Sequence, residues 1–236
     1  MSVEELKFYL STEQACSYLS DRSSASVFAD PDGTMTNEIY SVLINHGFRR
    51  SANFVYRPHC PTCSACKPAR VPVRQFKPNR NQKRVWGRNT DISIKETPAE
   101  FNEEQFELYC KYIHNRHTGG EMDHTDKNRY LEFLTSDWCD TIFYEFRRDN
   151  KLVAVAVTDN LREGLSALYT FFDPDYAKDS LGTLAILWQI EKAKDMRKPW
   201  LYLGYWIEES DKMRYKKNFS PLQIWDDNIW QPLHKT

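Results

Sequence analysis

A stretch of 52 residues between Glu38 and Asp91 contains no Asp or Glu but carries 11 Lys and Arg. It also holds five prolines, at positions 58, 61, 68, 72 and 78, which exclude a long helix because proline lacks a backbone donor and clashes with the preceding turn. The other 184 residues carry 21 basic against 33 acidic side chains. This segregation gives a local positive field that favours a polyanionic partner. We predict a basic, irregular or short-stranded region over residues 48–98.

The remaining composition indicates a folded protein. Hydrophobic residues make up 41% of the chain and aromatic residues 14%, which supports a core and excludes wholesale disorder. A length of 236 residues allows one large domain or two small domains that share an interface. We expect a division into a basic, cysteine-containing region over residues 1–98 and a second region over residues 99–236.

Nothing in the sequence predicts membrane insertion. Residues 1–7 lack the basic and apolar segments of a signal peptide, and no apolar run approaches the roughly 18 residues that a membrane span needs. We therefore expect a cytoplasmic protein with no membrane partner. In that compartment the six cysteines are expected to be thiols or metal ligands rather than disulfides.

Three cysteines, Cys60, Cys63 and Cys66, follow the pattern Cys-x2-Cys-x2-Cys. The pattern lacks the second pair of a zinc ribbon, and no cysteine follows at the interval of a ferredoxin cluster. A fourth ligand would have to come from Cys16 or His59. The run is compatible with a structural zinc or iron–sulfur cluster, and equally with reduced thiols that steady a proline-rich loop.

Helices are predicted over residues 36–46 and 102–116. After Ser136 the pattern changes to β-branched and aromatic runs, with Asp149-Asn150 as a hairpin turn. The elements expected there are, in order, strands over 141–147, 152–158 and 166–172, a helix over about 183–196, a strand over 200–206, a short basic helix over 210–218 and a strand over 221–226.

This succession resembles the GCN5-related N-acetyltransferase core. The expected fold class is therefore α+β, with a C-terminal mixed sheet flanked by helices and a smaller basic N-terminal region. In that fold the backbone N–H groups of a turn at a helix N-terminus bind the phosphates of an acyl carrier. The corresponding substrate-binding candidates here are Asp173, at the end of the preceding strand, and the turn residues Ser180, Leu181 and Gly182. An ordinary capped strand-to-helix connection is the alternative. The turn contains fewer glycines and basic residues than a typical acetyl-coenzyme A loop.

The strand over 200–206 is rich in aromatic residues and has Gly204 in its interior, which suggests a bulge or a close backbone approach. Tyr205 and Trp206 are either core residues or the walls of an apolar pocket that stack on a terminal base. Lys212 and Lys216 share a face of the following helix, as a solvated surface or as a phosphate contact. We name Tyr205, Trp206, Lys212 and Tyr215 as candidate catalytic residues.

The densest basic segment runs over residues 80–88 and includes Trp86, which could stack on a base. Contacts with nucleic-acid phosphates need little more than such charges, although a solvated basic strand is the alternative. The candidate nucleic-acid contacts are Arg80, Gln82, Lys83, Arg84 and Arg88.

Several motifs follow one another in register along the chain. They are Phe8-Tyr9-Leu10 with Cys16-Ser17-Tyr18-Leu19, Gly47-Phe48-Arg49-Arg50-Ser51, Tyr56-Arg57-Pro58-His59-Cys60 through Arg70, Phe172-Asp173-Pro174 with Ser180-Leu181-Gly182, and Leu203-Gly204-Tyr205-Trp206-Ile207 through Lys216. Together they closely resemble the bacterial aspartate/glutamate leucyltransferases of the arginyl-tRNA–protein transferase superfamily.

The resemblance implies an enzyme that moves leucine from Leu-tRNA to the N-terminal Asp or Glu of a protein and so marks that protein for degradation. The partners implied are Leu-tRNA and proteins with N-terminal Asp or Glu, and the basic segment then becomes the tRNA contact. No cofactor is required for the chemistry. An arginyl donor, a coenzyme A-dependent N-acetyltransferase and a non-enzymatic zinc-dependent RNA-binding protein remain alternatives.

An acceptor with an acidic side chain needs a cation in the site, ideally one that binds the carboxylate through two bonds. The sequence leaves Arg57, Arg70, Lys212 and Lys216 open for this role. We expect Arg70 to be the first choice and Lys216 the second, with Arg57 as a further substrate-binding candidate.

Overall fold

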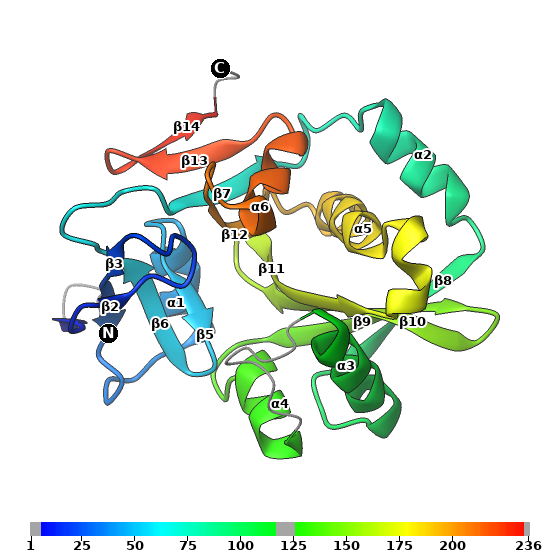
Figure 1. The fold of residues 1–236 in the computed structure, drawn as a ribbon, viewed down its shortest axis with the longest axis horizontal. Coiled ribbons are helices and arrows are strands. Elements are labelled where there is room, and N and C mark those ends of the chain that lie inside the picture. The colour runs from blue at the N-terminus through cyan, green and yellow to red at the C-terminus, as the bar shows by residue number, and fades with distance from the viewer. Residues whose placement is uncertain (1–5, 117–125, 234–236) are drawn as a thin grey trace.

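The computed structural model describes residues 6–116 and 126–233. Its strands form a small sheet near the N-terminus and a large sheet that runs across the molecule (Figure 1). The predicted α+β fold class, with a mixed sheet flanked by helices, is confirmed.

The small sheet is antiparallel, in the order β1-β4-β6-β5. Its strands are β1 (Phe8–Leu10), β4 (Ser26–Ala29), β6 (Phe54–Pro58) and β5 (Arg49–Ser51). Two short strands, β2 (Gln14–Ala15) and β3 (Ser23–Ser24), pair beside it. Helix α1 (Asn37–Ile44) confirms the first predicted helix, and it begins where the Thr36 hydroxyl accepts a bond from the Ile39 N–H.

The large sheet has eight strands in the order β14-β13-β7-β12-β11-β10-β9-β8. Among the described strands, only β11 and β12 are parallel neighbours. The strands are β7 (Lys67–Pro72), β8 (Ile92–Pro98), β9 (Thr141–Arg148), β10 (Lys151–Asn160), β11 (Gly164–Phe172), β12 (Trp200–Trp206), β13 (Gln223–Asp226) and β14 (Ile229–Pro232). The hairpin predicted at Asp149-Asn150 is confirmed, since both residues have positive φ as its tight turn requires.

Helices cover both faces of this sheet (Figure 1). On one face, α3 (Glu103–Arg116) and α4 (Lys127–Leu134) bury an aromatic cluster against β10 and β11. On the other face, α5 (Leu181–Asp195) and α2 (Arg80–Arg88) pack against the sheet and form a second cluster of buried hydrophobic residues. The short elements η2 (Pro174–Asp179), α6 (Asp211–Arg214) and η3 (Tyr215–Asn218) complete the set.

The region predicted to be irregular or short-stranded contains one regular helix, α2, so the prediction of no helix is wrong over residues 80–88. The five prolines all lie outside this helix, and Asn79 and Gln82 form a capping box at its start, which stabilises a helix N-terminus. Val85 anchors it in the core.

Strand β7 lies between β12 and β13, although it precedes them by more than a hundred residues in the chain. It pairs with Trp200–Trp206 on one side and with Gln223 and Ile224 on the other. Strand β8, which also precedes residue 99, forms the edge of the sheet opposite β14. The sheet therefore crosses residue 98, where the sequence predicts a division.

Among the described residues, no helix combines the length and the apolar character that crossing a lipid bilayer requires.

Candidate functional site

Strands β11 and β12 separate after a short parallel ladder. Their pairing joins Gly164–Ser166 with Trp200–Tyr202 and ends there, while both strands continue. On its other side, β12 shifts register against β7 between Tyr202 and Gly204, and Gly204 has a φ of 71°. The predicted bulge at Gly204 is confirmed. The separation leaves backbone groups of Ala167–Phe172 without a partner in β12, which makes a site for another group.

The side chain of Arg49 enters this opening from the small sheet. Its Nη2 donates to the Leu168 carbonyl oxygen at 3.2 Å. Leu168 lies just beyond Ser166, the last residue of β11 that pairs with β12. A Cβ atom at position 204 would lie 2.6 Å from Cζ of Arg49. Glycine is therefore required at 204 both by the positive φ and by the guanidinium that lies against it. The sequence does not distinguish Arg49 from its basic neighbours.

The four candidate catalytic residues differ in their access to solvent. Tyr205 is buried, its hydroxyl donates to the Tyr56 carbonyl at 3.2 Å, and burial raises its pKa well above the ordinary value. Trp206 belongs to the core beside α5, and its Nε1 has no hydrogen-bond partner within the described residues. By contrast, Lys212 is exposed, and Tyr215 is 43% exposed.

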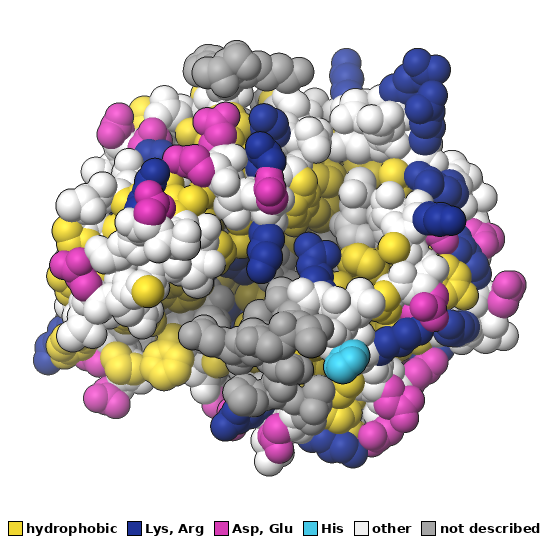
Figure 2. All heavy atoms as spheres, viewed as in Figure 1, with side chains coloured by type: hydrophobic (Ala, Val, Ile, Leu, Met, Phe, Trp, Pro, Cys, Tyr) yellow, Lys and Arg dark blue, Asp and Glu magenta, His cyan; other side chains and the backbone are white. Residues whose placement is uncertain are grey.

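Tyr215 lies where several elements meet. Its phenol is close enough to interact electrostatically with Tyr112 and Arg116 of α3 and with Arg49. Figure 2 shows this face of the molecule hollowed between α6 and α3, with Lys and Arg side chains around the hollow. The residue is partly exposed, and burial of its phenol raises the pKa of Tyr215 although Arg116 and Arg49 act in the opposite direction.

Asp173 is a buried anchor at the end of β11. Its carboxylate accepts bonds from Lys111 at 2.5 Å, from Lys151 at 2.9 Å and from the Asp175 N–H at 3.0 Å. Burial raises the pKa of Asp173, but these bonds outweigh burial and lower it below the ordinary value. With every oxygen engaged, the carboxylate caps η2 and positions the chain before α5.

The turn before α5 presents a helix N-terminus. Ser180 has a left-handed backbone conformation, and its side chain makes no capping bond. The N–H groups of Thr183 and Leu184 bond to the Ser180 carbonyl. Leu181 is buried. The space beside Gly182 is open, because a Cβ atom added there would meet only the Phe172 ring, at 3.6 Å. The first N–H groups of α5 have no partner inside the helix, as at any helix start.

Arg70, the first candidate for binding a carboxylate, is enclosed by protein. Its guanidinium lies 3.5 Å from the ring centre of Trp200 and 4.2 Å from that of Trp230. Nε donates to Gln223 at 2.9 Å, and Nη1 donates to Asn45 at 3.2 Å. These contacts join β7 to α1 and β13.

The other two cations are also held by the protein. Lys216 is buried, and its amine donates to the Tyr205 carbonyl oxygen at 2.5 Å. Burial and the charge of Arg49 hold the pKa of Lys216 well below its ordinary value of 10.5. Arg57 stacks over Phe48 at 5.0 Å and donates to the His46 carbonyl at 2.8 Å.

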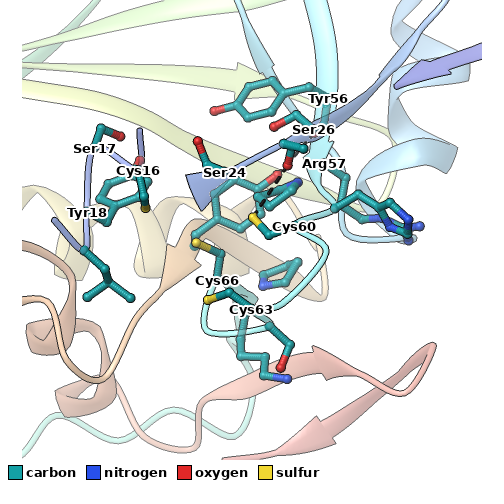
Figure 3. Close-up of a pocket in the computed structure, with 18 of the residues that line it drawn as sticks. Cys16, Ser17, Tyr18, Ser24, Ser26, Tyr56, Arg57, Cys60, Cys63 and Cys66 are labelled. Carbon is teal, nitrogen blue, oxygen red and sulfur yellow. Dashed lines mark hydrogen bonds between the residues drawn. The ribbon is translucent and has the colours of Figure 1, made fainter. Parts of the chain in front are cut away.

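The four candidate metal-binding cysteines line one cavity of about 780 Å³ between the small sheet and the strands β12 and β13. Figure 3 shows Cys60, Cys63 and Cys66 from the proline-rich loop on one side and Cys16 on the other. All six cysteines are unpaired, as expected. Within residues 6–116 and 126–233, however, no three His, Cys, Asp or Glu side chains converge as a metal site requires. No chemical step is assigned to a metal at these positions. The metal remains a prediction.

The thiols of this cavity differ in acidity. The Ala65 N–H and the Arg22 guanidinium, 3.2 Å from Sγ, lower the pKa of Cys63. Burial, together with the neighbouring thiols, raises the pKa of Cys66 to about 12. Cys63 is therefore the thiol that ionises more readily.

Helix α2 carries the candidate nucleic-acid contacts on its solvent side. Arg80, Lys83 and Arg84 are exposed, and basic side chains project over α2 in the upper right of Figure 2. Trp86 is 41% exposed. Gln82 is different, because it is buried in the capping box and its Nε2 donates to the Asn218 carbonyl. Arg88 donates to the Lys178 carbonyl at 2.6 Å, next to the start of α5.

Two family models match the chain, the N terminus of arginine-tRNA-protein transferase over residues 14–84 and its C terminus over residues 104–226. A leucyltransferase from Nitrosococcus oceani is 50% identical over 230 residues, which are 97% of each chain, and is named aspartate/glutamate leucyltransferase. A protein of the same name from Alcanivorax borkumensis is 47% identical over 96% of this chain and 93% of that one.

A solved structure shares the fold. It is the C-terminal domain of a putative lysylphosphatidylglycerol synthetase from Agrobacterium fabrum, with a TM-score of 0.51 and 12% identity over 69% of this chain and 60% of that one. This likeness concerns the fold alone. Because the sequence match runs over nearly the whole length of curated relatives, the resemblance is confirmed, and the chain belongs to the aspartate/glutamate leucyltransferases of the arginine-tRNA-protein transferase family.

Proposed function

We propose that this enzyme moves leucine from Leu-tRNA to the α-amine of a protein that begins with Asp or Glu. The observation that carries the proposal is the match to the leucyltransferase of Nitrosococcus oceani, 50% identical over 97% of both chains. The acyl donor, Leu-tRNA, is also a substrate of protein synthesis. We therefore expect the enzyme to act in the cytoplasm. The leucylated product is a candidate degradation signal.

The reaction is the aminolysis of an ester. The neutral α-amine attacks the ester carbonyl, the new N–C bond forms, and the C–O bond to the terminal ribose breaks. One proton passes from the amine to the departing ribose oxygen, and the products are a peptide bond and free tRNA. An α-amine has an ordinary pKa of about 7.7–8.0, so a useful fraction is neutral at cellular pH without a strong base.

The main demands on the protein are therefore orientation and stabilisation of the oxyanion. The opening between β11 and β12 is our candidate for the reaction centre, because it joins unpaired backbone to the start of α5. Tyr215 is our candidate donor to the ester oxygen, since the residue is partly exposed and burial of its phenol raises the pKa and so favours the protonated form. Helix α2 supplies exposed cations for the tRNA backbone.

One assay tests the donor and the acceptor together. The enzyme is incubated with Leu-tRNA, Arg-tRNA or acetyl-coenzyme A, each with a peptide that begins with Asp or with Lys. We expect transfer from Leu-tRNA to the Asp peptide. Transfer from Arg-tRNA or acetyl-coenzyme A instead would replace the proposed donor, and tRNA binding without transfer to either peptide would favour an RNA-binding protein.

A further inference from the structure

Selection of an acidic acceptor requires a cation beside the reacting amine, because a carboxylate left unpaired in a partly dehydrated site is strongly unfavourable. The following inference rests on the proposed function and identifies that cation. Among the four cations that the sequence leaves open, Arg70, Arg57 and Lys216 bond to protein groups. Lys212 is exposed on α6 and forms no ion pair with the described residues.

Arg49 differs from Arg70 and Lys216 in making a single side-chain hydrogen bond. It differs from Arg57, which also makes one, in lying against Gly204 where β11 and β12 separate. It is partly buried, and in the described part of the chain its guanidinium forms no ion pair with Asp or Glu. One hydrogen bond, from Nη2 to the Leu168 carbonyl, is its only side-chain bond there. A guanidinium has five N–H donors in a planar fork, so most of its donors form no hydrogen bond with the described residues.

The side chains around Arg49 are phenols rather than carboxylates. Tyr18, Tyr56 and Tyr205 are close enough to interact with its charge, and the Tyr205 ring centre lies 5.9 Å from Cζ. All three tyrosines also line the cavity of about 780 Å³ shown in Figure 3. The guanidinium therefore lies beside tyrosines that line this cavity and against the opening of the sheet, and no Asp or Glu among the described residues pairs with it.

Gly204 keeps this position available. Any larger residue at 204 would place Cβ against Nη1 and Cζ of Arg49. Lys216 is anchored one residue further along β12, through the Tyr205 carbonyl, and its depressed basicity leaves Arg49 as the stronger cation of the two. The Leu168 carbonyl and Gly204 thus contact Arg49 where the pairing of β11 with β12 ends.

We propose that Arg49 binds the side-chain carboxylate of the acceptor's N-terminal Asp or Glu and so selects acidic acceptors. The planar fork of a guanidinium matches a carboxylate through two parallel bonds. A tRNA phosphate is the less favoured ligand, because phosphate contacts need only exposed cations, and α2 supplies these. A cation enclosed in the sheet is suited to a single small anion that arrives together with the amine.

The test measures kcat/KM for leucine transfer to peptides that begin with Asp, Asn, Glu or Gln. It compares the wild-type enzyme with Arg49→Gln, Arg49→Lys and a matched control, Arg162→Gln, which removes an exposed arginine. The ratio of Asp to Asn rates is internal to each preparation, so a loss of folded enzyme does not alter it. KM for Leu-tRNA is measured in parallel.

We expect Arg49→Gln to lower the Asp rate more than tenfold, about the loss from breaking a buried charge pair, while the Asn rate is unchanged. Arg49→Lys should retain part of the selectivity, and Arg162→Gln all of it. Full selectivity in Arg49→Gln would overturn the inference, and a raised KM for Leu-tRNA with unchanged selectivity would assign Arg49 to the tRNA instead. A wild-type enzyme that transfers no leucine would refute the proposed function, and this inference with it.

Discussion

Arg50 of β5 and Asp159 of β10 form an ion pair with both side chains 0% exposed. Nε lies 2.9 Å from Oδ2, and Nη2 lies 2.5 Å from Oδ1. The same guanidinium donates to the carbonyls of Leu134 and Thr135. One side chain therefore ties the small sheet, the large sheet and the end of α4 together.

Asp159→Ala should destabilise the protein by about 3–5 kcal/mol, because it leaves the Arg50 charge buried without its partner. The control is Lys127→Ala, which breaks a surface pair with Glu103 whose side chains are 54% and 58% exposed and should cost at most about 1 kcal/mol. Urea unfolding measures both. Equal losses in the two variants would show that the buried pair does not hold the sheets together.

Replacing Arg80, Lys83 and Arg84 with Ala should weaken tRNA binding and flatten its salt dependence, because fewer counterions are released. The three side chains are exposed on α2, and Gln82 and Val85, which anchor the helix, stay intact. Filter binding over a range of salt concentrations measures the slope, with a triple Ala variant of Lys127, Arg129 and Arg162 as control. If affinity and slope match the wild type, the tRNA binds elsewhere.

The cysteine run should serve structure rather than nucleophilic chemistry. An amine that attacks an ester needs no covalent enzyme intermediate, although Arg22 and the Ala65 N–H favour the Cys63 thiolate. Cys63→Ser should lower thermal stability or metal content while the rate of leucine transfer changes little. Mass spectrometry that finds a leucyl thioester on Cys60, Cys63 or Cys66 would contradict this prediction.

Two glycine substitutions should have opposite effects. Gly204→Ala places a Cβ against Arg49 at a φ of 71°, and backbone strain of this kind alone costs about 1–3 kcal/mol. Gly87→Ala lies within α2, where an added Cβ meets nothing within 4 Å, and should stabilise by roughly 0.5–1 kcal/mol. Thermal unfolding measures both changes. A neutral Gly204→Ala would mean that Arg49 moves aside freely.

Lys216 should make stability depend on pH above neutrality. Its pKa in the folded protein lies well below 10.5, so between the two pKa values the unfolded chain binds more protons at this site. The free energy of unfolding therefore rises with pH through this window and stops rising near the unfolded value. Lys216→Met should lack that rise when urea unfolding is compared between about pH 7 and about pH 10. Parallel curves for the two proteins would contradict the depressed pKa.

Local patterns in the sequence predict most of the elements, because they depend on neighbouring residues. The helix start at Thr36, the turn at Asp149-Asn150 and the irregularity at Gly204 all follow from such patterns. The capping box of Asn79 and Gln82 was equally visible in the sequence. The basic charge of the segment favours a tRNA contact at Gln82, whereas the structure buries Gln82 in this capping box.

The roles of individual cations depend on tertiary contacts that no local pattern contains. Arg70 and Arg49 are both arginines of the acid-free stretch, yet two tryptophans from distant segments enclose Arg70. Arg49 reaches Leu168, 119 positions away in the chain. The available signal was indirect, namely the unusual Gly204 inside a strand, which implied that some unidentified group lies against it.

The position of β7 between β12 and β13 affects how the protein is made. As the ribosome releases the chain, β7 emerges while both of its partners are still more than a hundred residues from synthesis. Until then its two hydrogen-bonding edges are open to other chains, and long-range pairing of this kind is slow and prone to aggregation. A nascent chain that stalls before Trp200 thus lacks both flanking strands and should require protection by chaperones until synthesis is finished.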